Sequence, residues 1–77
     1  PDENLHICLD RCLKELSSKD RRLLLDYYSK DGREKIELRR RLAAELGISE
    51  NALRIRLSRL RATLKGCIEA CLKQDGE

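Results

Sequence analysis

Apolar residues recur along this chain at the three- and four-residue spacing of amphipathic helices. The pattern predicts helices over residues 4–16, 18–29, 32–46 and 50–73. Their inward positions include Leu5, Cys8, Leu9, Cys12, Leu13 and Leu16 in the first helix and Ile36, Leu42, Ala43 and Leu46 in the third. Glycine and β-branched residues are few, which disfavours a sheet. We therefore expect an all-α, four-helix domain.

Local capping signals separate these helices. Ser17 with Asp20, and Asp31 with Glu34, have the three-residue spacing of a capping box, so each pair should start a helix. Gly47 can take the left-handed conformation that ends the third helix.

Two residues later, Ser49 can cap the start of the last helix. A helix, a tight Gly-Ile-Ser turn and a second helix have the spacing of a DNA-binding helix-turn-helix, whose core we expect at residues 33–61. A purely structural corner would have the same spacing.

The last helix has two distinct faces. Leu53, Leu57, Leu60 and Leu64 form one apolar stripe, which turns a mixed polar and aliphatic face outward. On that face we expect base-reading residues at Asn51, Arg54, Ile55 and Ser58. Flanking residues are expected to contact phosphates: Arg39, Arg40, Arg41, Ser49, Arg56 and Arg59.

Charge is concentrated in the same part of the chain. The net charge is only +3, but residues 33–65 hold ten Lys and Arg against four Asp and Glu. A basic patch of this kind favours a polyanion, and double-stranded DNA is the expected partner; a solvated basic surface is the alternative. The two aromatic residues, Tyr27 and Tyr28, are too few to stack single-stranded bases in series.

Length and composition narrow the remaining classes. Seventy-seven residues suit one domain, and a start at Pro1 with no Met indicates an excerpt of a longer protein. Neither a membrane-spanning run nor a secretory signal is present, so we expect a cytoplasmic location and no membrane partner. The chain has one His, and its sequence shows neither a Ser-His-acid set nor a Gly-rich phosphate loop. These features argue against an enzyme.

The four cysteines form two matched pairs. Cys8 and Cys12 are four apart on the first helix, and Cys67 and Cys71 are four apart on the last. If these helices pack antiparallel, Cys8 meets Cys71 and Cys12 meets Cys67. We favour buried thiols that act as small core residues, with no cofactor. A four-thiolate zinc site and two interhelical disulfides are the alternatives, and a reducing cytoplasm counts against the disulfides.

Residues 42–61, from Leu42-Ala43 through Leu46-Gly47-Ile48-Ser49 to Arg59-Leu60-Arg61, resemble region 4 of the sigma-70 family of bacterial RNA polymerase sigma factors, the extracytoplasmic-function type in particular. Arg56 is typical of that family at its position. Residues 13–28 resemble the first part of the same region, although Ser17 stands where the family commonly has Pro. The cysteine pairs lie outside the family pattern.

The resemblance implies recognition of the minus-35 promoter element by the last helix and docking on the flap of the polymerase β subunit. It also implies possible sequestration by an anti-sigma protein. The second helix has more apolar residues than one core-facing stripe needs, so part of its surface is either buried against the other helices or offered to a partner. We expect the polymerase contact among these residues: Leu23, Leu24, Tyr27 and Tyr28. We expect the isolated domain to be monomeric. The alternatives are another helix-turn-helix regulator, which would dimerise on a palindrome, and a helical metal-sensing or protein-interaction module.

Overall fold

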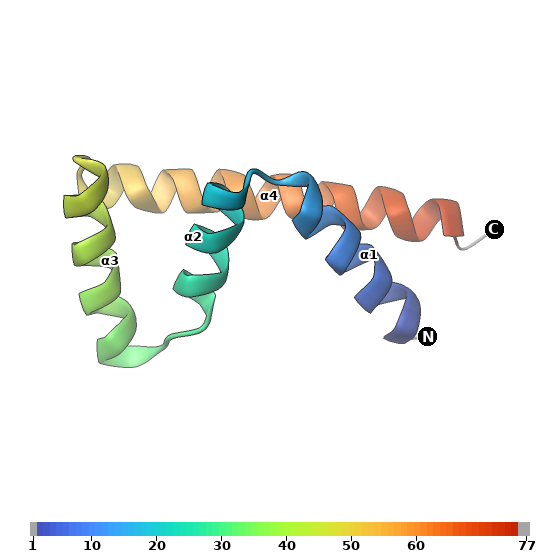
Figure 1. Ribbon diagram of the computed structural model, residues 1–77, viewed down its shortest axis with the longest axis horizontal. Coiled ribbons are helices and arrows are strands. Elements are labelled where there is room, and N and C mark those ends of the chain that lie inside the picture. The colour runs from blue at the N-terminus through green and yellow to red at the C-terminus, as the bar shows by residue number, and fades with distance from the viewer. Residues whose placement is uncertain (1, 76–77) are drawn as a thin grey trace.

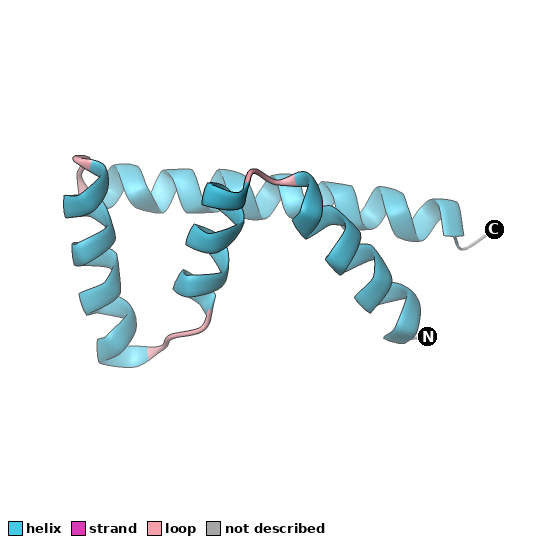
Figure 2. Cartoon of the chain, in the orientation of Figure 1, coloured by secondary structure: helices cyan, strands magenta, loops and turns pink. Residues whose placement is uncertain are grey.

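The computed structural model describes residues 2–75 of the chain. Within that range the fold is all-helical and has no strand (Figures 1 and 2). The elements are α1 (Asp2–Glu15), α2 (Ser18–Tyr28), α3 (Gly32–Leu46) and α4 (Glu50–Asp75). The all-α prediction is confirmed, and each predicted boundary lies within two residues of the observed one.

Helix α4 forms the long axis of the molecule. Its 26 residues span about 39 Å at 1.5 Å per residue, close to the 44 Å longest extent of the chain. The other three helices descend from α4 on one side, with α2 and α3 beside its first half and α1 beside its second half (Figure 1). The opposite side of the first half of α4 is left uncovered by other helices.

Three of the predicted caps are observed, and one is not. The Ser17 hydroxyl accepts from the Asp20 amide at 3.1 Å, and the Ser49 hydroxyl accepts from the Ala52 amide at 3.0 Å. Gly47 closes α3 with φ 69°, a left-handed conformation. Asp31 stands at the N-cap position and α3 starts at Gly32 as predicted, but the Asp31 side chain makes no capping hydrogen bond.

The apolar core lies where α2 and α3 meet the first half of α4. Its buried members are Leu23, Leu24, Ala43, Leu53 and Leu57. Partly buried side chains pack around them: Leu13, Leu16, Tyr27, Leu42, Leu46, Ile48, Leu60 and Leu64.

Two residues expected to face inward are largely exposed. Ile36 of α3 is 43% exposed, and Leu38, two positions later, is buried instead. Leu5 of α1 is 45% exposed, and Cys8 is the first buried residue of that helix among those described. Both expectations were therefore wrong.

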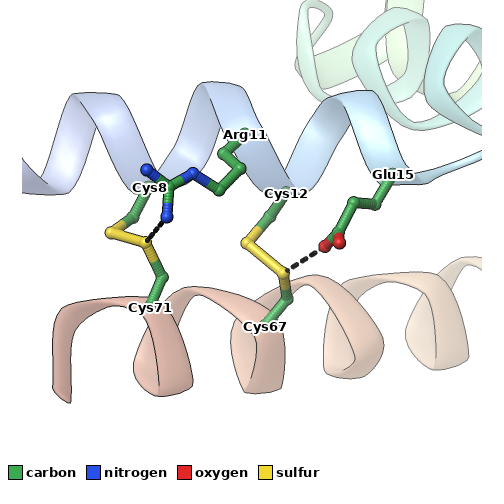
Figure 3. Close-up of a disulfide and its surroundings, with 6 residues drawn as sticks. All are labelled: Cys8, Arg11, Cys12, Glu15, Cys67 and Cys71. Carbon is green, nitrogen blue, oxygen red and sulfur yellow. Dashed lines mark hydrogen bonds between the residues drawn. A yellow bond between two sulfur atoms is a disulfide. The ribbon is translucent and has the colours of Figure 1, made fainter. Parts of the chain in front are cut away.

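Two disulfides join α1 to the second half of α4 (Figure 3). Cys8 is bonded to Cys71 and Cys12 to Cys67, which are the partners that the matched spacing predicts. The preference for free thiols was wrong. The cysteine side chains face one another across the helix pair. The Cα atoms of Cys8 and Cys71 are 5.7 Å apart and those of Cys12 and Cys67 are 5.9 Å apart, within the range that disulfides require.

None of the helices in the described part of the chain combines the length and the apolar character needed to cross a membrane.

Candidate nucleic-acid interface

The turn between α3 and α4 sets the rotation of α4 about its own axis. The Ile48 amide donates to the Ala43 carbonyl at 3.0 Å, and the Leu53 amide donates to the Ser49 carbonyl at 3.0 Å. Leu53 of α4 is fully buried and Ala43 of α3 is 3% exposed, so α4 is packed closely against α3. With Leu53 and Leu57 facing the core, the opposite side of α4 must face solvent.

The four residues expected to read bases lie together on that solvent-facing side. Asn51, Arg54, Ile55 and Ser58 are all exposed, and Ile55 has 46% of its surface accessible. All four line one shallow hollow of about 330 Å³. The hollow is completed by Tyr27, Tyr28, Leu57 and Arg61. An exposed Ile beside an amide, a hydroxyl and a guanidinium gives this surface both polar and apolar contacts to offer.

Sequence reasoning missed a cluster of cations and aromatic rings at one edge of the hollow. Tyr27 and Tyr28 pack edge to face with ring centroids 5.2 Å apart. The Lys35 ammonium lies 4.5 Å from the Tyr27 ring centre and 4.8 Å from that of Tyr28, and Arg61 lies 5.9 Å from that of Tyr28. These contacts join α2, α3 and α4, so no spacing within one helix could have revealed them. They hold two positive charges beside the hollow.

The residues expected to contact phosphates divide into two groups. Arg40, Arg41 and Arg59 are exposed. By contrast, Arg39 Nε lies 3.4 Å from Glu50 Oε1, and Arg56 Nη2 lies 3.3 Å from Asp20 Oδ1. These two ion pairs partly neutralise the charges of Arg39 and Arg56.

Ser49 is exposed at the start of α4 and has a structural role there. Its oxygen accepts from the Ala52 amide at 3.0 Å, which satisfies one of the amides at the N-terminus of the helix. The hydroxyl hydrogen stays available to donate to an anion. The nearby Glu50 carboxylate interacts favourably with the positive end of the helix dipole.

The expected polymerase-contacting residues of α2 do not all reach the surface. Leu23 and Leu24 are 7% and 4% exposed and belong to the core, so their assignment to a contact surface was wrong. Leu25 and Tyr28 are 50% and 46% exposed. Both line an apolar hollow of about 340 Å³ between α1, α2 and α4. Sequence reasoning missed Leu25 as an exposed residue. The pattern of three consecutive leucines, Leu23, Leu24 and Leu25, does not show which two face the core.

One group of possible metal ligands lies away from this interface, between α1 and α4. The Sγ atoms of Cys12 and Cys67 and a carboxylate oxygen of Glu15 lie within 4.8 Å of one another. The four-thiolate zinc site considered from the sequence is not formed, because the cysteines are paired in two disulfides.

Comparison of the chain with protein-family models, with curated proteins and with solved structures finds no match.

Proposed function

We propose that this chain is a promoter-recognising DNA-binding domain, equivalent to region 4 of a sigma-70 family sigma factor of the extracytoplasmic-function type. In this proposal α3, the Gly47 turn and α4 form a helix-turn-helix, α4 enters the major groove at the minus-35 element, and α1 packs antiparallel on α4. The observation that carries the proposal is the exposed group Asn51, Arg54, Ile55 and Ser58, which begins directly after the turn.

Each of these residues has a suitable partner on a base edge. Arg54 suits the two acceptors of guanine, and Asn51 suits the acceptor and donor pair of adenine. Ile55 can contact a thymine methyl group, and Ser58 can donate or accept. Four adjacent positions on the first turns of one helix can reach one short run of base pairs in the groove.

Phosphate contacts would come from both helices of the motif. Arg40 and Arg41 in the middle of α3 and Arg59 on α4 are exposed. The Ser49 hydroxyl and the N-terminus of α4 add an anion-binding position. Arg39 and Arg56 would join them only by exchanging a carboxylate partner for a phosphate.

The exposed surface of α2 would face the polymerase. Leu25 and Tyr28 border an apolar hollow that suits an apolar segment of a protein partner, and we assign it to the flap of the β subunit. An anti-sigma protein would compete for the same surface. The proposal assigns no catalysis to the chain, which stays a monomer until it binds polymerase. In the cytoplasm, where the proposal places it, the two disulfides would be subject to reduction.

The test is the salt dependence of binding to double-stranded DNA, measured by fluorescence anisotropy. Replacing Arg40, Arg41 and Arg59 together by Ala should reduce the slope of log affinity against log salt by about 0.9 for each phosphate that the variant no longer neutralises. Lys14→Ala, an exposed lysine of α1 whose side chain is 72% accessible, is the control and should leave the slope nearly unchanged. A chain that binds DNA without salt dependence, or not at all, would instead be an interaction module.

A further inference from the structure

The contact between α1 and α4 is built around sulfur. Among the described side chains of α1, Cys8 and Cys12 are the buried ones, at 0% and 2% exposure. The aliphatic residues nearest the N-terminus of that helix are outside the contact, with Leu5 and Ile7 about half exposed. No described aliphatic side chain of α1 is fully buried, so after reduction of the disulfides the helix is held by partly buried residues such as Leu9 and Leu13. A metal ion between two of the sulfurs would restore a direct link from α1 to α4.

The two sulfur pairs have opposite electrostatic surroundings (Figure 3). Arg11 Nη1 lies 3.6 Å from Cys71 Sγ, so a guanidinium donor faces the first pair. Glu15 Oε2 lies 2.9 Å from Cys67 Sγ, so a carboxylate faces the second pair. A divalent cation is attracted by the carboxylate and repelled by the guanidinium. The second pair is therefore the better place for a metal ion.

Ligand atoms are already gathered at that second pair. The Sγ atoms of Cys12 and Cys67 and a carboxylate oxygen of Glu15 lie within 4.8 Å of one another. In a tetrahedral zinc site with Zn–S bonds of about 2.3 Å, two thiolate sulfurs stand about 3.8 Å apart. Rotation of the two cysteine side chains, from Cα atoms 5.9 Å apart, can supply that separation once the disulfide bond is broken.

We propose that Cys12, Cys67 and Glu15 form a zinc-binding site when the Cys12–Cys67 disulfide is reduced. A dithiol supplies two electrons and two protons to the disulfide and is itself oxidised to a disulfide, leaving the two cysteines as thiols. Zinc then binds both sulfurs as thiolates, and the two thiol protons pass to solvent. The disulfide is the oxidised, metal-free state of the same pair of sulfurs.

Zinc is the cation that suits these ligands. Two thiolates and one carboxylate combine soft and hard donors, which zinc accepts in tetrahedral sites. Cys67 is only half-buried, so a water molecule can occupy the fourth position. The bound ion would join α1 to α4 in the reduced protein as the disulfide does in the oxidised one. This inference concerns residues outside the candidate DNA-binding face and does not depend on the proposed function.

The test is zinc titration of the reduced chain, after anaerobic removal of the dithiol, in competition with a chromophoric chelator. We expect one zinc ion per chain. Glu15→Gln should weaken binding by at least about 10-fold, because loss of even a group that only supports a metal ligand costs about 10–100-fold. Glu69→Gln, which removes an exposed carboxylate of α4 near Cys67 in sequence, is the matched control and should leave the affinity unchanged.

Cobalt spectra of the same proteins count the thiolate ligands. C8A/C71A should give the same sulfur-to-cobalt charge-transfer absorbance as the native chain, and C12A/C67A should give none. If C8A/C71A loses helix by circular dichroism, the comparison of Glu15→Gln with Glu69→Gln in the native chain carries the test. The proposal is overturned if the reduced chain binds no zinc or if these two variants bind it equally. The proposal is also overturned if a folded C8A/C71A variant gives half the charge-transfer absorbance of the native chain. That result would mean that all four cysteines bind the metal ion as thiolates.

Discussion

Arg56 of α4 forms an ion pair with Asp20 of α2, with Nη2 3.3 Å from Oδ1 and the two side chains 39% and 29% exposed. A partly exposed pair of this kind contributes at most about 1 kcal/mol to stability. Under the proposed function, this pair would weaken recognition, because Arg56 would have to exchange the Asp20 carboxylate for a phosphate before it could contact DNA.

Asp20→Asn should therefore strengthen binding to double-stranded DNA and steepen its salt dependence. With the carboxylate gone, Arg56 can make a full phosphate contact, which adds about 0.9 to the slope of log affinity against log salt. Asp10→Asn makes the same change of charge on α1, where Asp10 is 68% exposed and pairs with Lys14. Anisotropy titrations at several salt concentrations compare the two, and equal effects would mean that net charge alone is responsible.

Arg54→Ala should reduce sequence discrimination rather than general affinity. Loss of a bidentate contact to guanine costs about 1–3 kcal/mol at the preferred site and relaxes the preference at one base pair. Arg40→Ala is the comparison, since this exposed arginine of α3 is assigned to phosphate. Titrations with preferred and mismatched duplexes distinguish them. A uniform loss across all duplexes for both variants would make Arg54 a phosphate contact as well.

Leu25→Lys should weaken binding to core RNA polymerase without changing binding to free DNA. Leu25 is half exposed beside an apolar hollow, so a lysine there is tolerated by the fold but disfavours an apolar partner. Leu5→Lys changes an equally exposed leucine on α1 and should have little effect. Gel filtration with purified core polymerase checks both. Equal retention of polymerase by the two variants would remove α2 from the proposed contact.

Two glycines should respond in opposite directions to substitution by alanine. Gly47 has φ 69°, and placing a side chain in that left-handed conformation costs about 1–2 kcal/mol. Gly66 lies inside α4 with nothing within 4 Å of an added Cβ, so alanine there should stabilise the protein by about 0.5–1 kcal/mol. Urea unfolding of the oxidised chain measures both changes. A stabilising Gly47→Ala would contradict the account of the turn.

The helix boundaries could be read from the sequence because local chemistry determines them. Ser17, Gly47 and Ser49 act on backbone groups within a few residues, so their effects do not depend on the rest of the fold. The position of the cysteine partners followed in the same way from helical periodicity. Their oxidation state did not, because spacing specifies which sulfurs meet and says nothing of the bond between them.

Contacts between different helices were harder to predict. The pairing of Arg56 with Asp20, and the cluster of Lys35 and Arg61 around two tyrosines, depend on how helices cross. Whether Leu38 or Ile36 of α3 is buried also depends on how α3 crosses its neighbouring helices. Helical periodicity orders residues around one axis and leaves the relative rotation of two axes undetermined. The solvent-facing side of α4 was predictable because the turn itself sets the rotation of α4.

The most direct test of the proposed function is selection of duplexes bound by this chain from a randomised double-stranded DNA pool. If α4 reads one major-groove site as a monomer, repeated rounds should enrich one short non-palindromic motif, and Arg54→Ala should lose the preference at one position of it. Enrichment of a palindrome would indicate a dimeric regulator. The absence of any enriched motif would contradict the claim that Asn51, Arg54, Ile55 and Ser58 form a DNA-reading surface.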